Sequence, residues 1–154
     1  PELVFFILNI LSLIILSAFF SSSETALTAV SEPRIHQLAL QGNKRAIIIQ
    51  KILAKKEKMI SSILIGNNLV NIIASVYATS FAINFFGEYG LVVITVLLTI
   101  ILVIFAEVIP KTYAYNHADQ TALLVAPIIN FIIVILTPAT FITEVENGKQ
   151  KILA

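Results

Sequence analysis

Residues 3–20 read LVFFILNILSLIILSAFF, an apolar run interrupted only by Asn9, Ser12 and Ser17. A helix needs about 20 mainly apolar residues to cross the hydrocarbon core of a bilayer. A signal peptide fits this run poorly, because no basic segment precedes it and Glu24 stands where small neutral residues would lead to a cleavage site. The sequence therefore predicts a first membrane-spanning helix over about residues 3–30.

Three further apolar runs follow, over residues 59–86, 91–109 and 122–142. The first two are long enough to span a bilayer. The last contains Pro127 and Pro138, and proline removes a backbone donor and kinks a helix. This run either spans with two kinks or lies along the membrane interface or around a bundle, and we favour the second arrangement. We expect an all-α integral membrane protein with three transmembrane helices and a Pro-bracketed juxtamembrane belt helix.

The composition of the 154-residue chain agrees with a membrane protein. Hydrophobic residues make up 58% and charged residues 12%, against roughly 45–50% and 25% in soluble domains. A soluble enzyme of this size would be unable to bury so much apolar surface. The chain has no Cys, which excludes disulfides and thiolate metal sites, and its net charge of +1 suggests no nucleic-acid partner.

The basic residues are concentrated between the first two apolar runs, where seven of the ten lie: Arg34, Lys44, Arg45, Lys51, Lys55, Lys56 and Lys58. The segment 87–90, between the second and third runs, has none. The positive-inside rule therefore predicts that residues 31–58 are cytoplasmic and that the turn at 87–90 and the N-terminus are outside. The tail is then cytoplasmic if the fourth run does not cross. A prokaryotic plasma membrane fits this pattern.

The cytoplasmic insert has a helical pattern of its own. Apolar residues recur at i, i+3 and i+4 on both sides of Gly42-Asn43, so we expect a helical hairpin over residues 33–57 with a turn at these two residues. Its basic face could hold anionic membrane lipid. The same charges could equally serve only to set the topology.

Polar residues interrupt the three predicted spans at similar depth, in the cytoplasmic half of the bilayer. The first span has Ser17 and then Ser21 to Glu24, the second has Gly66, Asn67, Asn68 and Asn71, and the third ends at Glu107 near Pro110 and Lys111. An intramembrane carboxylate is costly and is a functional hypothesis by default. Hydroxyl, carboxamide and carboxylate oxygens are ligands suited to Mg²⁺, Ca²⁺ or Na⁺. Pro110 also leaves the Ala106 carbonyl without its usual donor four residues later.

Structural readings of the same residues remain open. Ser and Asn often hydrogen-bond between membrane helices as packing contacts, and Glu107 could pair locally with Lys111. Glu24 either reaches the site or lies at the cytoplasmic interface, which we favour. We expect His36 and His117 at the interface as well, where neither could support an intramembrane serine protease.

Three motifs in three helices resemble the CNNM (cyclin M)/CorC family of magnesium-transport proteins: residues 19–27 (FFSSSETAL), 65–71 (IGNNLVN) and 107–111 (EVIPK). The resemblance extends from Leu3 to about Ile142. It implies a homodimer with three transmembrane helices, a cytoplasmic helical hairpin, a belt helix and a metal site in an inward-facing cavity. The implied metal ligands are Ser21, Asn67 or Asn68, Asn71 and Glu107, with backbone carbonyls near Gly66.

The resemblance also implies that the chain is the transmembrane part of a longer protein. Such proteins continue into a cytoplasmic CBS-domain pair that binds adenine nucleotide, so we expect residues 143–154 to begin the linker to that region. The expected function is Mg²⁺ export, and whether Na⁺ drives it stays open, as does a channel mechanism. The alternative is a non-transporting membrane anchor or divalent-cation sensor for the cytoplasmic module.

Overall fold

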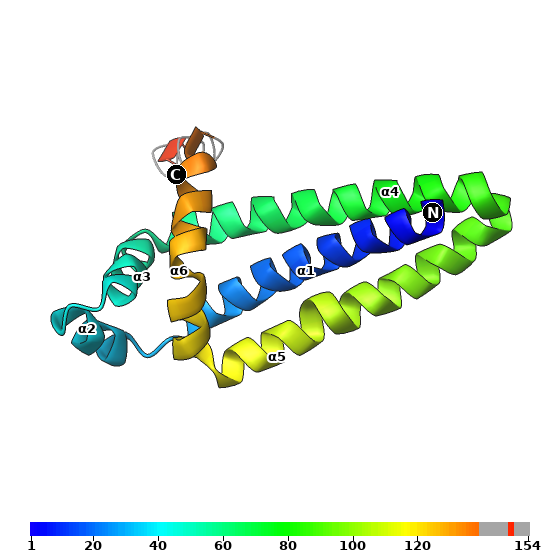
Figure 1. Ribbon diagram of the computed structural model, residues 1–154. Helices are drawn as coiled ribbons and strands as arrows, with labels where there is room; N and C mark the ends of the chain where they lie inside the picture. Colours follow the sequence, from blue (N-terminus) through cyan, green and yellow to red (C-terminus); the bar gives the residue numbers. More distant parts are fainter. Residues whose placement is uncertain (139–147, 150–154) are drawn as a thin grey trace.

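The computed structural model describes residues 1–138 and 148–149 and contains no β-strand among them. Figure 1 shows a bundle of long helices with shorter helices at one end. In chain order the elements are α1 (Glu2–Ala29), α2 (Glu32–Leu40), α3 (Lys44–Ala54), α4 (Lys56–Ile101), the π-helix η1 (Leu102–Val108), α5 (Ile109–Asn116) and α6 (Ala118–Ile135).

Helix α4 folds back on itself at Gly87, whose backbone has φ 69° and ψ −158°. Glycine is the residue that adopts such angles at little cost, since it has no Cβ. The first arm, 56–86, runs away from the short helices, and the second returns through η1 and α5 (Figure 1). Residues 88–90 are already helical. The reversal is therefore sharper than the four-residue turn that the sequence suggests.

Small side chains fill the interior of the bundle, where α1 contacts α4, η1 and α5. Apart from Ile63, the buried residues of α4 beyond its first turn recur every four positions: Ser62, Gly66, Val70, Ala74, Ala78 and Ala82. Small residues let membrane helices approach closely. Toward the N-terminal end the contact is aromatic, with the Phe6 ring stacked on Phe81 at a centroid distance of 3.8 Å.

The outer surface of the bundle is apolar, which confirms the all-α membrane fold. In the most apolar 18-residue stretch of α1 only 17% is buried, and in the most apolar 18-residue stretch of residues 56–116 only 6% is buried. The long α1, the path 56–116 and α6 are each long and apolar enough to span a bilayer. Because the chain reverses direction at Gly87, residues 56–116 form two long helical segments that can each span a bilayer. At 1.5 Å per residue, α1 is about 42 Å long and the first arm of α4 about 46 Å.

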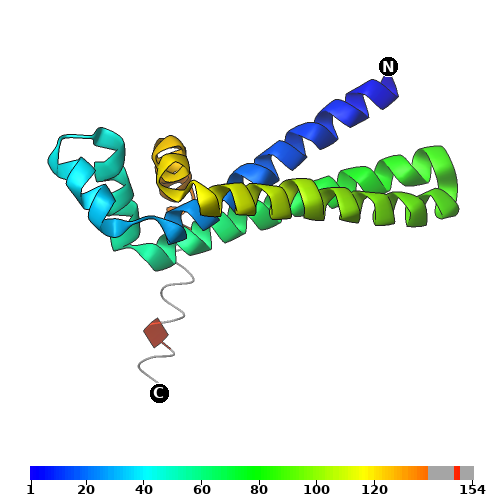
Figure 2. The ribbon, with the colours of Figure 1, turned by 90° about the horizontal axis from the view of Figure 1, so that it is seen from below.

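Helix α6 lies across the end of the bundle rather than along it (Figures 1 and 2). It contacts α1, α3, α4 and α5. This is the arrangement expected of a belt helix, although α6 begins at Ala118, four residues before the predicted start. The predicted end of the belt, 139–142, and the predicted linker, 143–154 apart from residues 148 and 149, lie outside the described residues.

Helices α2 and α3 form the expected hairpin beside α6. Gly42 has φ +87°, and the Asn43 side chain caps α3 by accepting the N–H groups of Arg45 and Ala46 at 3.0 and 3.1 Å. Capping satisfies backbone donors that a helix N-terminus otherwise leaves free. The cap thus fixes the start of α3 directly before Arg45.

Arg45 ties the hairpin to the belt. Pro127 lies inside α6 and has no N–H, so the Leu123 carbonyl lacks its donor four residues later. The Arg45 guanidinium replaces that donor, with Nη1 at 3.1 Å from the Leu123 oxygen and 3.5 Å from that of Leu124. A proline that would weaken α6 is thereby accommodated by a side chain from α3.

Asp119 makes a second attachment at the start of α6. Its carboxylate accepts the Ser31 N–H at 2.9 Å and lies 3.5 Å from the Arg34 guanidinium. These contacts join the beginning of the belt to the beginning of α2, so α6 is connected to the hairpin both at the start of α2 and at the start of α3.

Candidate cation site

A hydroxyl of α1 and two carboxamides of α4 meet in the interior of the bundle. Ser17 is 1% exposed, and its Oγ lies 3.1 Å from both Asn67 Oδ1 and Asn71 Oδ1. Asn67 and Asn71 are four residues apart, so they share one face of α4. We call Ser17, Asn67 and Asn71 the oxygen cluster.

Three side-chain oxygen atoms meet in the oxygen cluster. As placed, both asparagines turn their carbonyl oxygens toward Ser17, and a serine hydroxyl carries a single hydrogen. The Ser17 hydroxyl can therefore donate to only one of the two asparagine oxygens at a time. A cation or an additional donor would satisfy the lone pairs that remain.

Two more hydroxyls in this region are buried without any partner within the described residues. They are Ser21 Oγ, one turn beyond Ser17 on α1, and Ser62 Oγ, one turn before Gly66 on α4. Leaving a buried polar group unsatisfied costs about 1–3 kcal/mol. In the predicted topology both hydroxyls lie on the cytoplasmic side of the oxygen cluster, so a ligand entering from the cytoplasm would meet them first.

Gly66 lets α1 and α4 pack closely beside the oxygen cluster. A Cβ at this position would lie 2.7 Å from Cε1 and Cζ of Phe20, which is 7% exposed. Close approach of the Phe20 ring is therefore a sufficient reason for glycine here. Whether the Gly66 carbonyl also binds a cation, as the resemblance implies, stays a prediction.

Glu107 lies in η1, which packs against both α1 and α4. In this π-helix the Ile109 N–H bonds to the Ile104 carbonyl, five residues earlier. The wider register comes directly before Pro110, which has no N–H to continue the α-helical pattern. π-Helical turns are rare and often lie at functional sites.

The Glu107 side chain is half-buried, next to the fully buried Ala106. Within residues 1–138 its carboxylate has no ion pair or hydrogen bond, so the alternative Glu107–Lys111 pair is not formed there. The carboxylate is thus available at the level where η1 meets α1 and α4.

Most of the predicted residues of α1 and α4 lie at or beside the oxygen cluster, but one of them does not. Asn67 and Asn71 belong to the oxygen cluster and Ser21 is buried beside it on α1, whereas Asn68 is exposed on another face of α4. Sequence reasoning did not include Ser17 and Ser62 among the site residues. Their signal is position, because Ser17 lies one turn from Ser21 and Ser62 one turn from Gly66 on the buried face.

A small cleft of about 90 Å³ lies between the two arms of α4, beyond Asn71. Its polar lining consists of the hydroxyls of Ser75, Thr79, Thr95 and Thr99. Three of these hydroxyls donate to carbonyls four residues earlier at 2.7–2.9 Å, which leaves their oxygen lone pairs free to accept or to bind a cation. The second arm supplies Thr95 and Thr99, and the facing first arm supplies Ser75 and Thr79.

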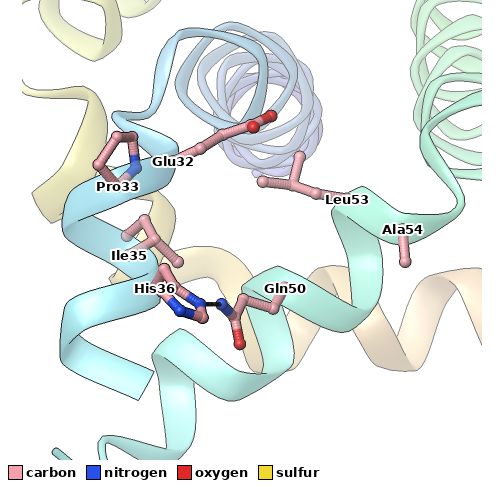
Figure 3. Close-up of a pocket in the computed structure, with 7 residues that line it drawn as sticks. All are labelled: Glu32, Pro33, Ile35, His36, Gln50, Leu53 and Ala54. Carbon is pink, nitrogen blue, oxygen red and sulfur yellow. Dashed lines mark hydrogen bonds between the residues drawn. The ribbon is translucent and has the colours of Figure 1, made fainter. Parts of the chain in front are cut away.

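A larger hollow of about 540 Å³ lies between α2 and α3, on the helical hairpin (Figure 3). His36 and Gln50 face each other across it, and Gln50 Nε2 donates to His36 Nδ1 at 2.8 Å. The other histidine, His117, lies between α5 and α6 and stacks on Tyr113. Both histidines therefore lie in or beside the short helices, outside the long helical segments that hold the oxygen cluster.

Comparison with known proteins gives a consistent result. Residues 8–147 match the family described as the cyclin M transmembrane N-terminal domain. The chain is 38% identical over 145 residues to a UPF0053 protein of Haemophilus influenzae, covering 94% of this chain and 34% of that protein. It is 41% identical over 107 residues to the UPF0053 inner membrane protein YfjD of Escherichia coli, covering 70% of this chain and 25% of that protein.

A further relative is named for a substrate. The polyamine export protein of Haemophilus influenzae is 28% identical over 150 residues, covering 89% of this chain and 35% of that protein. The chain spans about a third of the length of this relative and of the UPF0053 protein of the same organism, and a quarter of YfjD.

Proposed function

Because this chain belongs to the cyclin M transmembrane domain family, we propose that it carries Mg²⁺ out of the cytoplasm across the plasma membrane. The proposed ligands are the oxygen cluster together with Ser21 and Glu107. Asn68 is exposed and takes no part in this version of the site.

The geometry of the oxygen cluster carries the proposal. Mg²⁺ prefers octahedral oxygen coordination at about 2.0–2.1 Å, which sets neighbouring ligand oxygens about 3.0 Å apart. The Ser17 oxygen lies 3.1 Å from each asparagine oxygen, so little movement is needed to turn the three toward one ion. The Glu107 carboxylate would supply the negative charge that a divalent ion requires in a medium of low polarity.

The hydroxyl-lined cleft between the arms of α4 supplies a route outward. Ser75 lines the cleft and follows Asn71 by one turn of α4, and its hydroxyl donates to the backbone carbonyl of Asn71. The cleft therefore begins one turn beyond the oxygen cluster. Release to the outside would require the arms to separate around the cleft. Na⁺ suits the same oxygen ligands, and coupling to Na⁺ remains part of the proposal.

Mg²⁺ flux from liposomes tests the site. We expect Ser17→Ala and Glu107→Gln each to lower the flux at least tenfold, and isothermal titration calorimetry to show weaker Mg²⁺ binding. Ser12→Ala is the matched control, because Ser12 is an exposed serine of α1 whose hydroxyl bonds only to the Leu8 carbonyl. Flux that is unchanged in Ser17→Ala and Glu107→Gln would overturn the assignment of these residues.

Polyamine export is a second candidate, favoured by the name of one relative. Carboxamide oxygens and a carboxylate can also accept hydrogen bonds from ammonium groups. The same liposomes loaded with spermidine distinguish the two: spermidine flux without Mg²⁺ flux would favour the polyamine. Mg²⁺ binding with no flux of either cation would favour the anchor or sensor.

A further inference from the structure

A pocket of about 240 Å³ lies where the α3–α4 junction meets the belt helix α6. One side is basic and the other is mainly apolar. The α3–α4 junction contributes Lys51, Lys55 and Lys58, and the belt contributes Ile133 and Val134 together with the polar residues Asn130 and Thr137.

The charge of this pocket is of one sign. Among the described residues that line it, three are lysines and none is acidic. The pocket adjoins the N-terminus of α4, whose Lys55 cap makes no side-chain hydrogen bond. The first backbone N–H groups of a helix lack intrahelical partners, and the helix dipole is positive at this end. The three lysine side chains therefore favour an anion with several acceptor oxygens, such as a phosphate, and the nearby helix N-terminus adds to the positive potential.

The apolar wall indicates what is attached to that phosphate. Ile133 is partly buried against the core, whereas Val134 is 63% exposed and extends the apolar side outward. A free phosphate gains nothing from such a wall, but an acyl chain does, because burying apolar surface is favourable. The pocket also lies at the belt, at the predicted level of the cytoplasmic membrane interface, where lipid headgroups are.

We propose that this pocket binds an anionic phospholipid, with the phosphate between Lys51 and Lys58 and an acyl chain along Ile133 and Val134. The site is distinct from the oxygen cluster and does not depend on which cation is transported. A lipid held here would contact α3, α4 and α6 at once and so stabilise the attachment of the belt.

Native mass spectrometry of the detergent-purified chain tests the proposal with phosphatidylglycerol as the probe. Phosphatidylcholine with the same acyl chains and glycerol 3-phosphate are measured in separate arms. We expect Lys51→Gln combined with Lys58→Gln to weaken phosphatidylglycerol binding roughly 30-fold, because each lysine near an anionic headgroup contributes about fivefold. Val134→Asn, which keeps every lysine, should weaken it several-fold.

The matched control is Lys44→Gln combined with Lys111→Gln. It removes the same charge from two exposed lysines that do not line the pocket, and it should change binding less than twofold. Equal losses in both double variants would overturn the proposal in favour of general surface attraction. Equally tight phosphatidylcholine would overturn the anionic specificity, and equally tight glycerol 3-phosphate would show a phosphate site instead of a lipid site.

Discussion

Ser17 and Ser21 lie one turn apart on α1 and differ in their hydrogen bonds. Ser17 contacts two carbonyl oxygens of α4, whereas the buried Ser21 hydroxyl has no partner in the described part of the chain. At the scale of the residue, the candidate site thus combines a bonded buried hydroxyl with an unpartnered one. A bound cation should therefore change the stability of the protein more than it would if these residues made only a packing contact.

Ser21→Ala should therefore have opposite effects without and with the ion. Removing an unsatisfied buried hydroxyl should raise the stability of the cation-free protein by about 1 kcal/mol. The same change should abolish most of the Mg²⁺-induced rise in melting temperature, measured by thermal unfolding in detergent. Ser23→Ala is the control, because the buried Ser23 hydroxyl is already bonded to the Phe19 carbonyl at 2.6 Å. A destabilised Ser21→Ala protein that keeps its Mg²⁺ response would contradict this prediction.

Gly66→Ala should destabilise the protein by about 1–3 kcal/mol, the usual cost of overpacking a core. The added methyl group would meet the Phe20 ring at 2.7 Å. Phe20→Leu removes the ring, so the two changes together should cost less than the sum of the single changes in a double-mutant cycle. Strict additivity would show that the Phe20 ring is not what requires glycine.

At the scale of the element, the belt helix and the π-helix each depend on a proline. Pro127 removes a donor from α6, and Arg45 of α3 supplies the replacement. Pro110 follows η1, where the hydrogen-bond register has widened. In both elements a proline leaves a backbone carbonyl without its usual donor, and in α6 a side chain of a neighbouring helix replaces it.

Arg45→Met should loosen the belt. The Leu123 carbonyl would lose its donor, at a cost of about 1–3 kcal/mol, while the apolar part of the side chain would remain. Pro127→Ala in the same protein restores a backbone N–H four residues after Leu123 and should recover most of the loss. Limited proteolysis near residues 118–135, together with the melting temperature, reports the effect. Failure of Pro127→Ala to rescue would separate Arg45 from the proline.

The cleft between the arms of α4 gives a prediction about transport. Thr79→Val combined with Thr99→Val keeps the shape of the side chains and removes two cleft hydroxyls. We expect Mg²⁺ flux to fall several-fold while the calorimetric affinity stays the same, since neither residue belongs to the oxygen cluster. Thr28→Val is a suitable control, because Thr28 is exposed on α1 and outside the cleft. An equal loss of affinity would place these threonines in the binding site instead.

At the scale of the whole molecule, the N-terminus and the reversal of α4 lie at one end, and the hairpin of α2 and α3 and the belt helix lie at the other (Figure 1). This arrangement agrees with the topology predicted from the basic residues, which still requires a measurement. The absence of Cys makes single-cysteine labelling free of background. The homodimer remains a prediction that the mass of the purified protein in detergent would check.

Tyr89→Cys should react with a membrane-impermeant maleimide added to intact cells, because Tyr89 is 92% exposed beside the reversal. Leu40→Cys, at a site 76% exposed on the hairpin, should react only after the membrane is permeabilised. The reverse pattern would invert the topology, and with it the proposed direction of transport.

The sequence predicts the long helical segments, the hairpin and the belt because each depends on local properties: the length of an apolar run, a Gly-Asn turn, or a pair of prolines. It also predicts the depth of the polar residues. It does not predict which of these residues contact one another, because this depends on how α1 and α4 are rotated about their axes. Successive helix residues point about 100° apart, which is enough to direct Asn68 away from the face that carries Asn67. Likewise, the contact between Arg45 and Leu123 joins residues 78 positions apart.

That contact has a consequence for the evolution of the family. A proline at position 127 is tolerable only while another group serves the Leu123 carbonyl, so the residues at positions 45 and 127 are expected to change together across relatives. Lineages that lose the arginine should also lose the proline, or gain a donor elsewhere on α3. An alignment in which the two positions vary independently would indicate that other groups commonly donate to the carbonyl at position 123.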